Sequence, residues 1–192
     1  MALARWKHLC IDATDVESAA RFWAELLGLR VVRLDDGDVH LLRAGDEQAV
    51  WVNAVPEPQT VKQRVHLDVL APSVAAVEDL GAVRLSADGE FPWTVLADPE
   101  GGELCVFVRD EVPDYRLYEL CVDCGSDHLG IATWWADVLG ARLVESDRGF
   151  SYVERADGLP FEAMVLPAGA GTQAGEEPHP LGRHCRVGAP AA

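Results

Sequence analysis

A repeated motif constrains what this chain can fold into more than any other feature of its sequence. Lys7–Ala13 (KHLCIDA) matches Tyr118–Cys124 (YELCVDC), and Phe22–Gly28 (FWAELLG) matches Trp134–Gly140 (WWADVLG). The first pair is offset by 111 residues and the second by 112, so the later copy carries one inserted residue. In each copy a β-prone run precedes a helical run. The pattern therefore indicates a duplicated structural unit.

The first copy contains the signals for one strand, one helix and three further strands. A β-prone run over Trp6–Asp12 precedes Thr14-x-x-Glu17, which has the spacing of a helix capping box. Apolar residues then recur at helical spacing as far as Gly28, which stands where a C′ glycine ends a helix. The spacing predicts a βαβββ unit whose last strands lie at about 29–34, 39–44 and 49–55.

Two further copies of this unit follow along the chain. The second begins at Arg64–Val69, has a short helix from Ser73 and includes the turn at Asp98–Gly102. The third begins at Tyr115, and its helix is expected to be capped by Asp127. These patterns predict an α+β protein with modules at 6–55, 64–109 and 113–166, followed by an irregular, disordered tail at 167–192.

The charge balance argues against several classes of partner. Asp and Glu number 32 against 16 Lys and Arg, which gives a net charge of -16. Such a surface repels nucleic acids and anionic membranes. No apolar run reaches the roughly 18 residues that a membrane span needs, and no secretory leader is evident. The five cysteines, an odd number, are expected to be free thiols, and the cytoplasm is the expected location.

Three segments carry a resemblance to a known family. His8, the helix-starting Asp15 and Phe22–Gly28 look like the opening of a glyoxalase or extradiol-dioxygenase module. Arg64–Asp68, followed by Asp98–Gly101, looks like the closing module. The chain thus resembles the glyoxalase-like branch of the vicinal oxygen chelate superfamily, which also contains bleomycin-resistance proteins.

The resemblance covers residues 6 to about 166 and implies an architecture. Paired βαβββ modules would form a partial barrel around a cavity, and residues 1–112 would be one glyoxalase-like domain. Residues 113–166 would be a third module, half of an incomplete second domain. Its apolar face would have no fourth module to cover it, so we expect it to dock on the first domain or to form a homodimer.

A metal site is a further implication of the resemblance. In that family each module supplies one ligand from its first strand and one from its last. His8 and His66 match the first-strand positions, and Cys105 stands where the second module should have a glutamate. These three residues are the predicted ligands of a divalent metal such as Zn, Fe, Mn or Ni. In the alternative interpretation the histidines hydrogen-bond an organic ligand and Cys105 is a core thiol.

Other side chains suggest ligand binding or a second site. Trp51, Asn53 and Trp93 are predicted to line the cavity and contact a small aromatic molecule. Glu119 occupies the position of the first-copy histidine and is either a metal ligand or a solvated strand-end residue. Cys121-x-x-Cys124 lacks the second pair of ligands that a zinc clip requires, so no function is expected for it.

Three functions fit this sequence. The chain could be a metal-assisted lyase, isomerase or dioxygenase acting on a small molecule. It could instead be a metal-free protein of bleomycin-resistance type that binds a drug or metabolite. It could also be an inactive remnant of a four-module protein. The missing carboxylates count against the first, and the aromatic strands favour the second.

The segment Ala168–Arg183 suggests why a fourth module is missing. Back-translated with GC-rich codons and read one nucleotide earlier, it can encode VPEPGPKPVKNRIHWDV. That peptide repeats the Val55–Pro58 linker and the Val61–Asp68 strand at the place where the duplication requires a fourth module. We predict a reading-frame shift here, which the nucleotide sequence of the gene would test directly.

Overall fold

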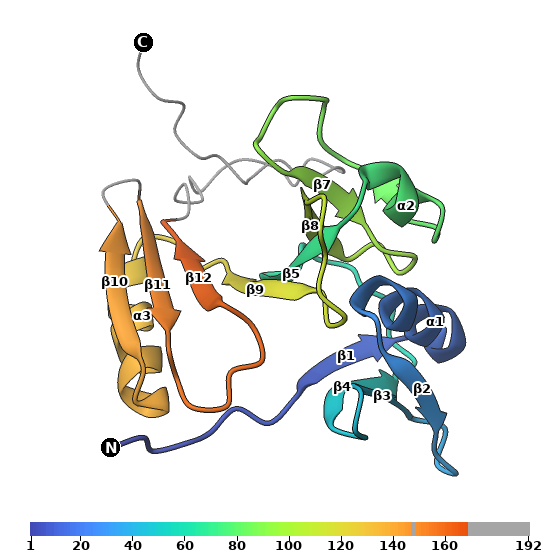
Figure 1. Ribbon diagram of the computed structural model, residues 1–192, viewed down its shortest axis with the longest axis horizontal. Helices are drawn as coiled ribbons and strands as arrows, with labels where there is room; N and C mark the ends of the chain where they lie inside the picture. Colours follow the sequence, from blue (N-terminus) through green and yellow to red (C-terminus); the bar gives the residue numbers. More distant parts are fainter. Residues whose placement is uncertain (147–148, 169–192) are drawn as a thin grey trace. The chain divides into compact units, whose positions relative to one another are not determined.

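The computed structural model describes residues 1–146 and 149–168. It contains the three βαβββ modules in succession (Figure 1), so the predicted α+β class is confirmed. The first module comprises β1 (Leu9–Ala13), α1 (Val16–Leu27), β2 (Arg30–Arg33), β3 (Val39–Leu42) and β4 (Gln48–Ala54). The second comprises β5 (Val65–Ala71), α2 (Val74–Glu78), β6 (Val83–Arg84), β7 (Thr94–Ala97) and β8 (Glu103–Val108). The third comprises β9 (Leu117–Val122), α3 (His128–Leu139), β10 (Arg142–Ser146), β11 (Phe150–Glu154) and β12 (Ala163–Pro167).

Pro167 ends β12 and therefore does not begin the irregular tail that the sequence predicted. The rest of that tail, with most of the segment assigned to a reading-frame shift, lies outside the described residues. No helix in the described part of the chain is long and apolar enough to cross a membrane.

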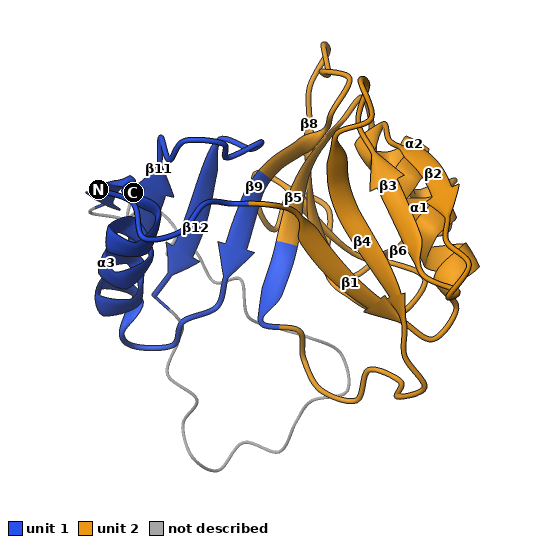
Figure 2. Cartoon of the chain, turned by 90° about the horizontal axis from the view of Figure 1, so that it is seen from below, with its two compact units in different colours: residues 1–6, 64–66, 119–192 blue, residues 7–63, 67–118 orange. Residues whose placement is uncertain are grey.

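The chain divides into two compact units (Figure 2). The larger unit contains residues 7–63 and 67–118, and the smaller contains residues 1–6, 64–66 and those from 119 onward. The residues of strands β5 and β9 are divided between the two units, with one end of each strand in each unit. The domain boundary near residue 112 that the sequence suggested stays a prediction.

Two open sets of strands make up the larger unit. The first module forms a sheet in the order β1-β4-β3-β2, with β1 and β4 parallel. The second module's strands run in the order β5-β8-β7-β6, with β5 and β8 parallel. In β4, Val50 and Val52 are fully buried and Trp51 between them is only partly so, because successive side chains point to opposite faces. The apolar face of this sheet packs on α1.

The sequence predicted the C-terminal end of α1 correctly and its N-terminal cap incorrectly. Gly28 adopts the left-handed conformation, with φ of 71°, and ends the helix as expected. The capping box predicted from Thr14 and Glu17 is wrong. Asp15 is the N-cap and accepts a hydrogen bond from the backbone of Ser18 at 3.0 Å, while Glu17 pairs with an arginine of β2.

The smaller unit is built on the third module. Its strands run in the order β10-β11-β12-β9, and α3 packs on them. Asp127 caps α3 as predicted by accepting a hydrogen bond from the backbone N–H of Gly130 at 3.1 Å. The N-terminal segment joins this unit, since the ring of Trp6 meets that of Phe161 edge-on with centroids 5.0 Å apart.

Candidate functional site

The sheet of the first module presents a polar face on the side opposite α1. The register of β1 and β4 sets Cys10 beside Trp51 and Asp12 beside Asn53. The register of β3 and β4 sets His40 on the other side of Trp51. Because side chains alternate along a strand, these residues share one face. The same alternation brings the predicted metal ligand His8, which directly precedes β1, to this face.

Two histidines surround the indole of Trp51. The His40 ring meets it at 4.4 Å between centroids, and the His8 ring lies at 5.6 Å. The indole N–H donates a hydrogen bond to Asp38 Oδ2 at 3.2 Å, which fixes the orientation of the ring. Nδ1 of His8 and Nε2 of His40 are buried and have no hydrogen-bond partner within the described part of the chain. A bound molecule could therefore satisfy both nitrogens.

The surroundings of His8 favour its neutral imidazole. Burial lowers the pKa of His8 below its ordinary value, and repulsion from Lys7 and from His40 lowers it further. A neutral imidazole has one nitrogen that can accept a hydrogen bond or bind a metal. Nearby, the Asn53 amide donates to Asp12 Oδ1 at 2.8 Å, which holds the predicted ligand-binding amide in place.

The second module contributes three rings of an aromatic row, and Tyr118 of β9 contributes the fourth. Phe91 and Trp93 stack at 5.6 Å, Trp93 lies 5.5 Å from Phe107, and Phe107 lies 5.3 Å from Tyr118. All four side chains are only partly buried. Trp93 directly precedes β7 and is not part of the strand, and its buried indole nitrogen has no hydrogen-bond partner among the described residues.

One of the three predicted metal ligands lies beside a carboxylate. Asp68 pairs with Cys105 across β5 and β8, and both side chains are buried. His8 and Cys105 belong to the larger unit and His66 belongs to the smaller, so the site that these three residues would share stays a prediction.

The pair offers donors that suit Zn²⁺ or Fe²⁺. A carboxylate oxygen is a hard donor and a thiolate sulfur is a soft one, and both ions accept either. The sequence analysis missed Asp68 and also His40. Both could have been found from strand alternation, once Asp68 was placed on the face of His66 and the β3–β4 hairpin was paired in register.

Glu119 lies on β9 of the third module and is partly buried. Burial raises its pKa to about 7, and the neighbouring charge of Glu162 contributes to the rise. The carboxyl of Glu119 is thus partly buried and not fully solvated. Whether it serves a second ligand site stays a prediction.

A family model described as the glyoxalase-like domain matches residues 8–107, which is more than half of the chain. The chain belongs to the glyoxalase-like domain family. No curated protein matches the chain. The resemblance inferred from the sequence is therefore confirmed at the level of the superfamily.

Solved structures show the same fold. Glyoxalase I from Zea mays is similar with a TM-score of 0.64 and 14% sequence identity, over 87% of this chain and 69% of the maize chain. A candidate dioxygenase from Bacillus subtilis is similar with a TM-score of 0.58 and 14% identity, over 86% of this chain and 64% of that protein. The chain thus spans about two thirds of the length of these neighbours. At such identities the likeness shows the fold alone.

Proposed function

We propose that this glyoxalase-like protein binds a small planar organic molecule that carries neighbouring oxygen atoms, on the polar face of its first module. The observation that carries the proposal is the arrangement around Trp51. His8 and His40 flank the indole, and each has a buried ring nitrogen with no hydrogen-bond partner in the described chain. A ligand ring can lie against these aromatic surfaces while its oxygens bond the two nitrogens.

Trp51 and Asn53 are already held in place by hydrogen bonds, which supports their role in ligand binding. Trp51 is held by Asp38 and Asn53 by Asp12, so neither has to be ordered when a ligand binds. The lowered pKa of His8 keeps its imidazole neutral and able to accept a proton from a ligand hydroxyl. The aromatic row around Trp93 adds a second, partly exposed apolar surface in the same unit.

A second candidate function is metal-assisted catalysis of the lyase, isomerase or dioxygenase type. The pairing of Asp68 with Cys105 favours it, because a buried carboxylate and a buried thiolate side by side could hold a divalent ion that keeps positions free for two substrate oxygens. Such an ion would polarise those oxygens when bound. The role of these two residues would be to hold the ion and to exclude water, since both are buried.

Ligand binding can be tested with a panel of phenols, catechols and α-hydroxyketones. Each compound is screened by thermal shift, and hits are measured by calorimetry with and without a chelator. We expect at least one compound to bind, with affinity reduced about tenfold or more in Trp51→Leu and His40→Ala. Trp134→Phe is the matched control, because that tryptophan is 56% exposed on α3.

The outcomes separate the two functions. Binding that survives the chelator and depends on Trp51 supports the metal-free site. Binding that is lost on chelation, and equally lost in Cys105→Ser, supports the metal-assisted function. Binding that is unchanged in both Trp51→Leu and His40→Ala would overturn the proposal for the first module's face.

A further inference from the structure

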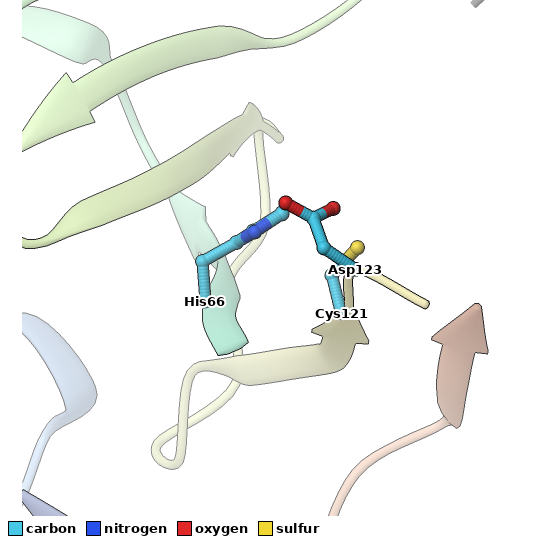
Figure 3. Close-up of side chains that lie close together, drawn as sticks. All are labelled: His66, Cys121 and Asp123. Atoms are coloured by element: carbon cyan, nitrogen blue, oxygen red, sulfur yellow. The ribbon is translucent and has the colours of Figure 1, made fainter. Parts of the chain in front are cut away.

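A second set of metal-ligating side chains meets in the smaller unit. His66 is near the start of β5, Cys121 is near the end of β9, and Asp123 directly follows that strand. Figure 3 shows the imidazole of His66 reaching toward the side chains of the other two. Potential ligand atoms of the three residues all lie within 4.8 Å of one another.

Backbone pairing holds the three donors in place. The backbone N–H of Asp123 donates to the carbonyl oxygen of Arg64 at 2.7 Å. The guanidinium of Arg64 in turn donates to the carbonyl oxygen of Asp123, at 3.2 Å from Nε and 2.9 Å from Nη2. These bonds join the chain before His66 to the chain after Cys121. The donors are therefore positioned by paired strand ends, which is a more rigid support than a free loop.

Burial and donor chemistry suggest the kind of ligand. His66 is 6% exposed and Cys121 4% exposed, whereas Asp123 is partly exposed. One side of the group therefore opens toward solvent. An imidazole nitrogen, a thiolate and a carboxylate are the ligands of Zn²⁺ in proteins, and two anionic donors offset its charge.

We propose that His66, Cys121 and Asp123 form a binding site for Zn²⁺ or a similar divalent ion, with a fourth position open to water. Ligand atoms around tetrahedral zinc lie roughly 3.5 Å apart, given bonds of about 2.0–2.3 Å. The group must contract by roughly 1.3 Å at most to reach that spacing, from a limit of 4.8 Å. Rotation of the partly exposed Asp123 side chain can supply this movement.

The neighbouring cysteine is not part of this site. The Cys124 thiol donates to the backbone carbonyl of Val122 at 3.1 Å. Among the described residues, its sulfur is not in the group of donor atoms that His66, Cys121 and Asp123 form. The Cys121-x-x-Cys124 motif therefore contributes one ligand and not two. This makes Cys124→Ser a matched control that changes a thiol three residues away.

Titration of the metal-free full chain with Co²⁺ tests the site, because a thiolate bound to Co²⁺ gives a charge-transfer absorption. We expect one equivalent to produce this band and Zn²⁺ to displace it. The band should persist in Cys124→Ser and Cys105→Ser and disappear in Cys121→Ser. Asp123→Asn should weaken binding about tenfold or more. Cys121→Ala, with folding checked by circular dichroism, guards against misfolding of the serine variant.

Asp68 and Cys105 are the ligands proposed above for the metal-assisted function, so the variants must separate the two sites. A band that survives Cys121→Ser but is lost in Cys105→Ser would overturn this proposal and favour the metal-assisted function described above. Absence of any band in the wild type would also overturn it, while leaving metal-free ligand binding at Trp51 unaffected. A band lost only in the Cys121 variants supports it.

Discussion

The carboxylate of Glu100, in the turn between β7 and β8, accepts a hydrogen bond from the backbone N–H of Thr14 at 3.2 Å and from its hydroxyl at 3.0 Å. The backbone N–H of Asp15 donates to the same carboxylate at 2.8 Å. A residue of the second module thus satisfies donors at the start of the first module's helix. It also places a negative charge at the positive end of the α1 dipole.

Replacing Glu100 should weaken the larger unit. In Glu100→Ala three donor groups at the helix start lose their hydrogen bonds, and we expect a loss of about 1–2 kcal/mol in the free energy of unfolding. Chemical denaturation at neutral pH measures it. Glu111→Ala, an exposed change nearby in sequence, is the control and should be close to neutral. Equal stability of both variants would contradict the bridging role.

The same contact should depend on pH. Hydrogen bonds from Asp15 and Thr14 lower the pKa of Glu100 below its ordinary 4.5. A carboxyl with a depressed pKa stabilises the fold above its unfolded pKa, and this contribution is lost as pH falls through the folded pKa. The stability difference between wild type and Glu100→Ala should therefore be constant above about pH 5 and shrink in more acid solution.

Local signals in the sequence were sufficient for much of the fold. Gly28 and Asp127 were assigned correctly, because a C′ glycine and an N-cap aspartate act on adjacent backbone. The capping box at Thr14 and Glu17 was wrong because a competing carboxylate arrives from Glu100, which is 86 residues away from Thr14. No local pattern in a sequence reports such a distant partner.

The candidate sites were harder to predict than the elements. His66 and Cys105 were predicted as ligands from the resemblance and stay predictions, whereas His40 comes beside Trp51 only through the cross-strand register. Register depends on which strands pair, and that is decided by packing over the whole sheet. Trp51 was placed correctly on its strand, since alternation alone assigns it to the face opposite Val50 and Val52.

Gly28 should resist substitution for two separate reasons. Its φ of 71° disfavours any side chain, and an added Cβ would lie 1.9 Å from the carbonyl oxygen of Asp114. We expect Gly28→Ala to cost at least about 2 kcal/mol of stability, or to prevent folding. Gly37→Ala is the matched control, because Gly37 also has a positive φ but no heavy atom within 4 Å of its Cβ position. The difference in melting temperature between the two variants isolates the steric part.

The neutral state of His8 can be measured directly. Its pKa should lie below 6.5 in a titration followed by NMR of the ring protons, owing to burial, Lys7 and His40. Lys7→Gln removes one positive charge and should move this pKa upward, whereas Lys62→Gln should leave it unchanged. A His8 pKa at or above the ordinary value in the wild type would remove the basis for a neutral imidazole in the ligand site.

Glu119 gives the third module a pH dependence of the opposite sign to that of Glu100. Its pKa rises from 4.5 to about 7, chiefly through burial. Between these values the folded state binds more protons than the unfolded state, so stability should fall as pH rises from about 4.5 to about 7. Glu119→Gln mimics the neutral carboxyl and should abolish that slope.

The expected gain at about pH 8 is at most about 3 kcal/mol relative to wild type, and the two proteins should have nearly equal stability at about pH 4. Urea unfolding at both pH values, followed by circular dichroism, measures the difference. Glu162→Gln removes the neighbouring negative charge and should reproduce a small part of the gain, since that charge is the lesser cause of the shift. Glu145→Gln, at an exposed position of β10, should show no such pH dependence. If Glu119→Gln is no more stable than wild type at the higher pH, the carboxyl has found a compensating ligand or proton donor in solution, and its burial is not a cost to the fold.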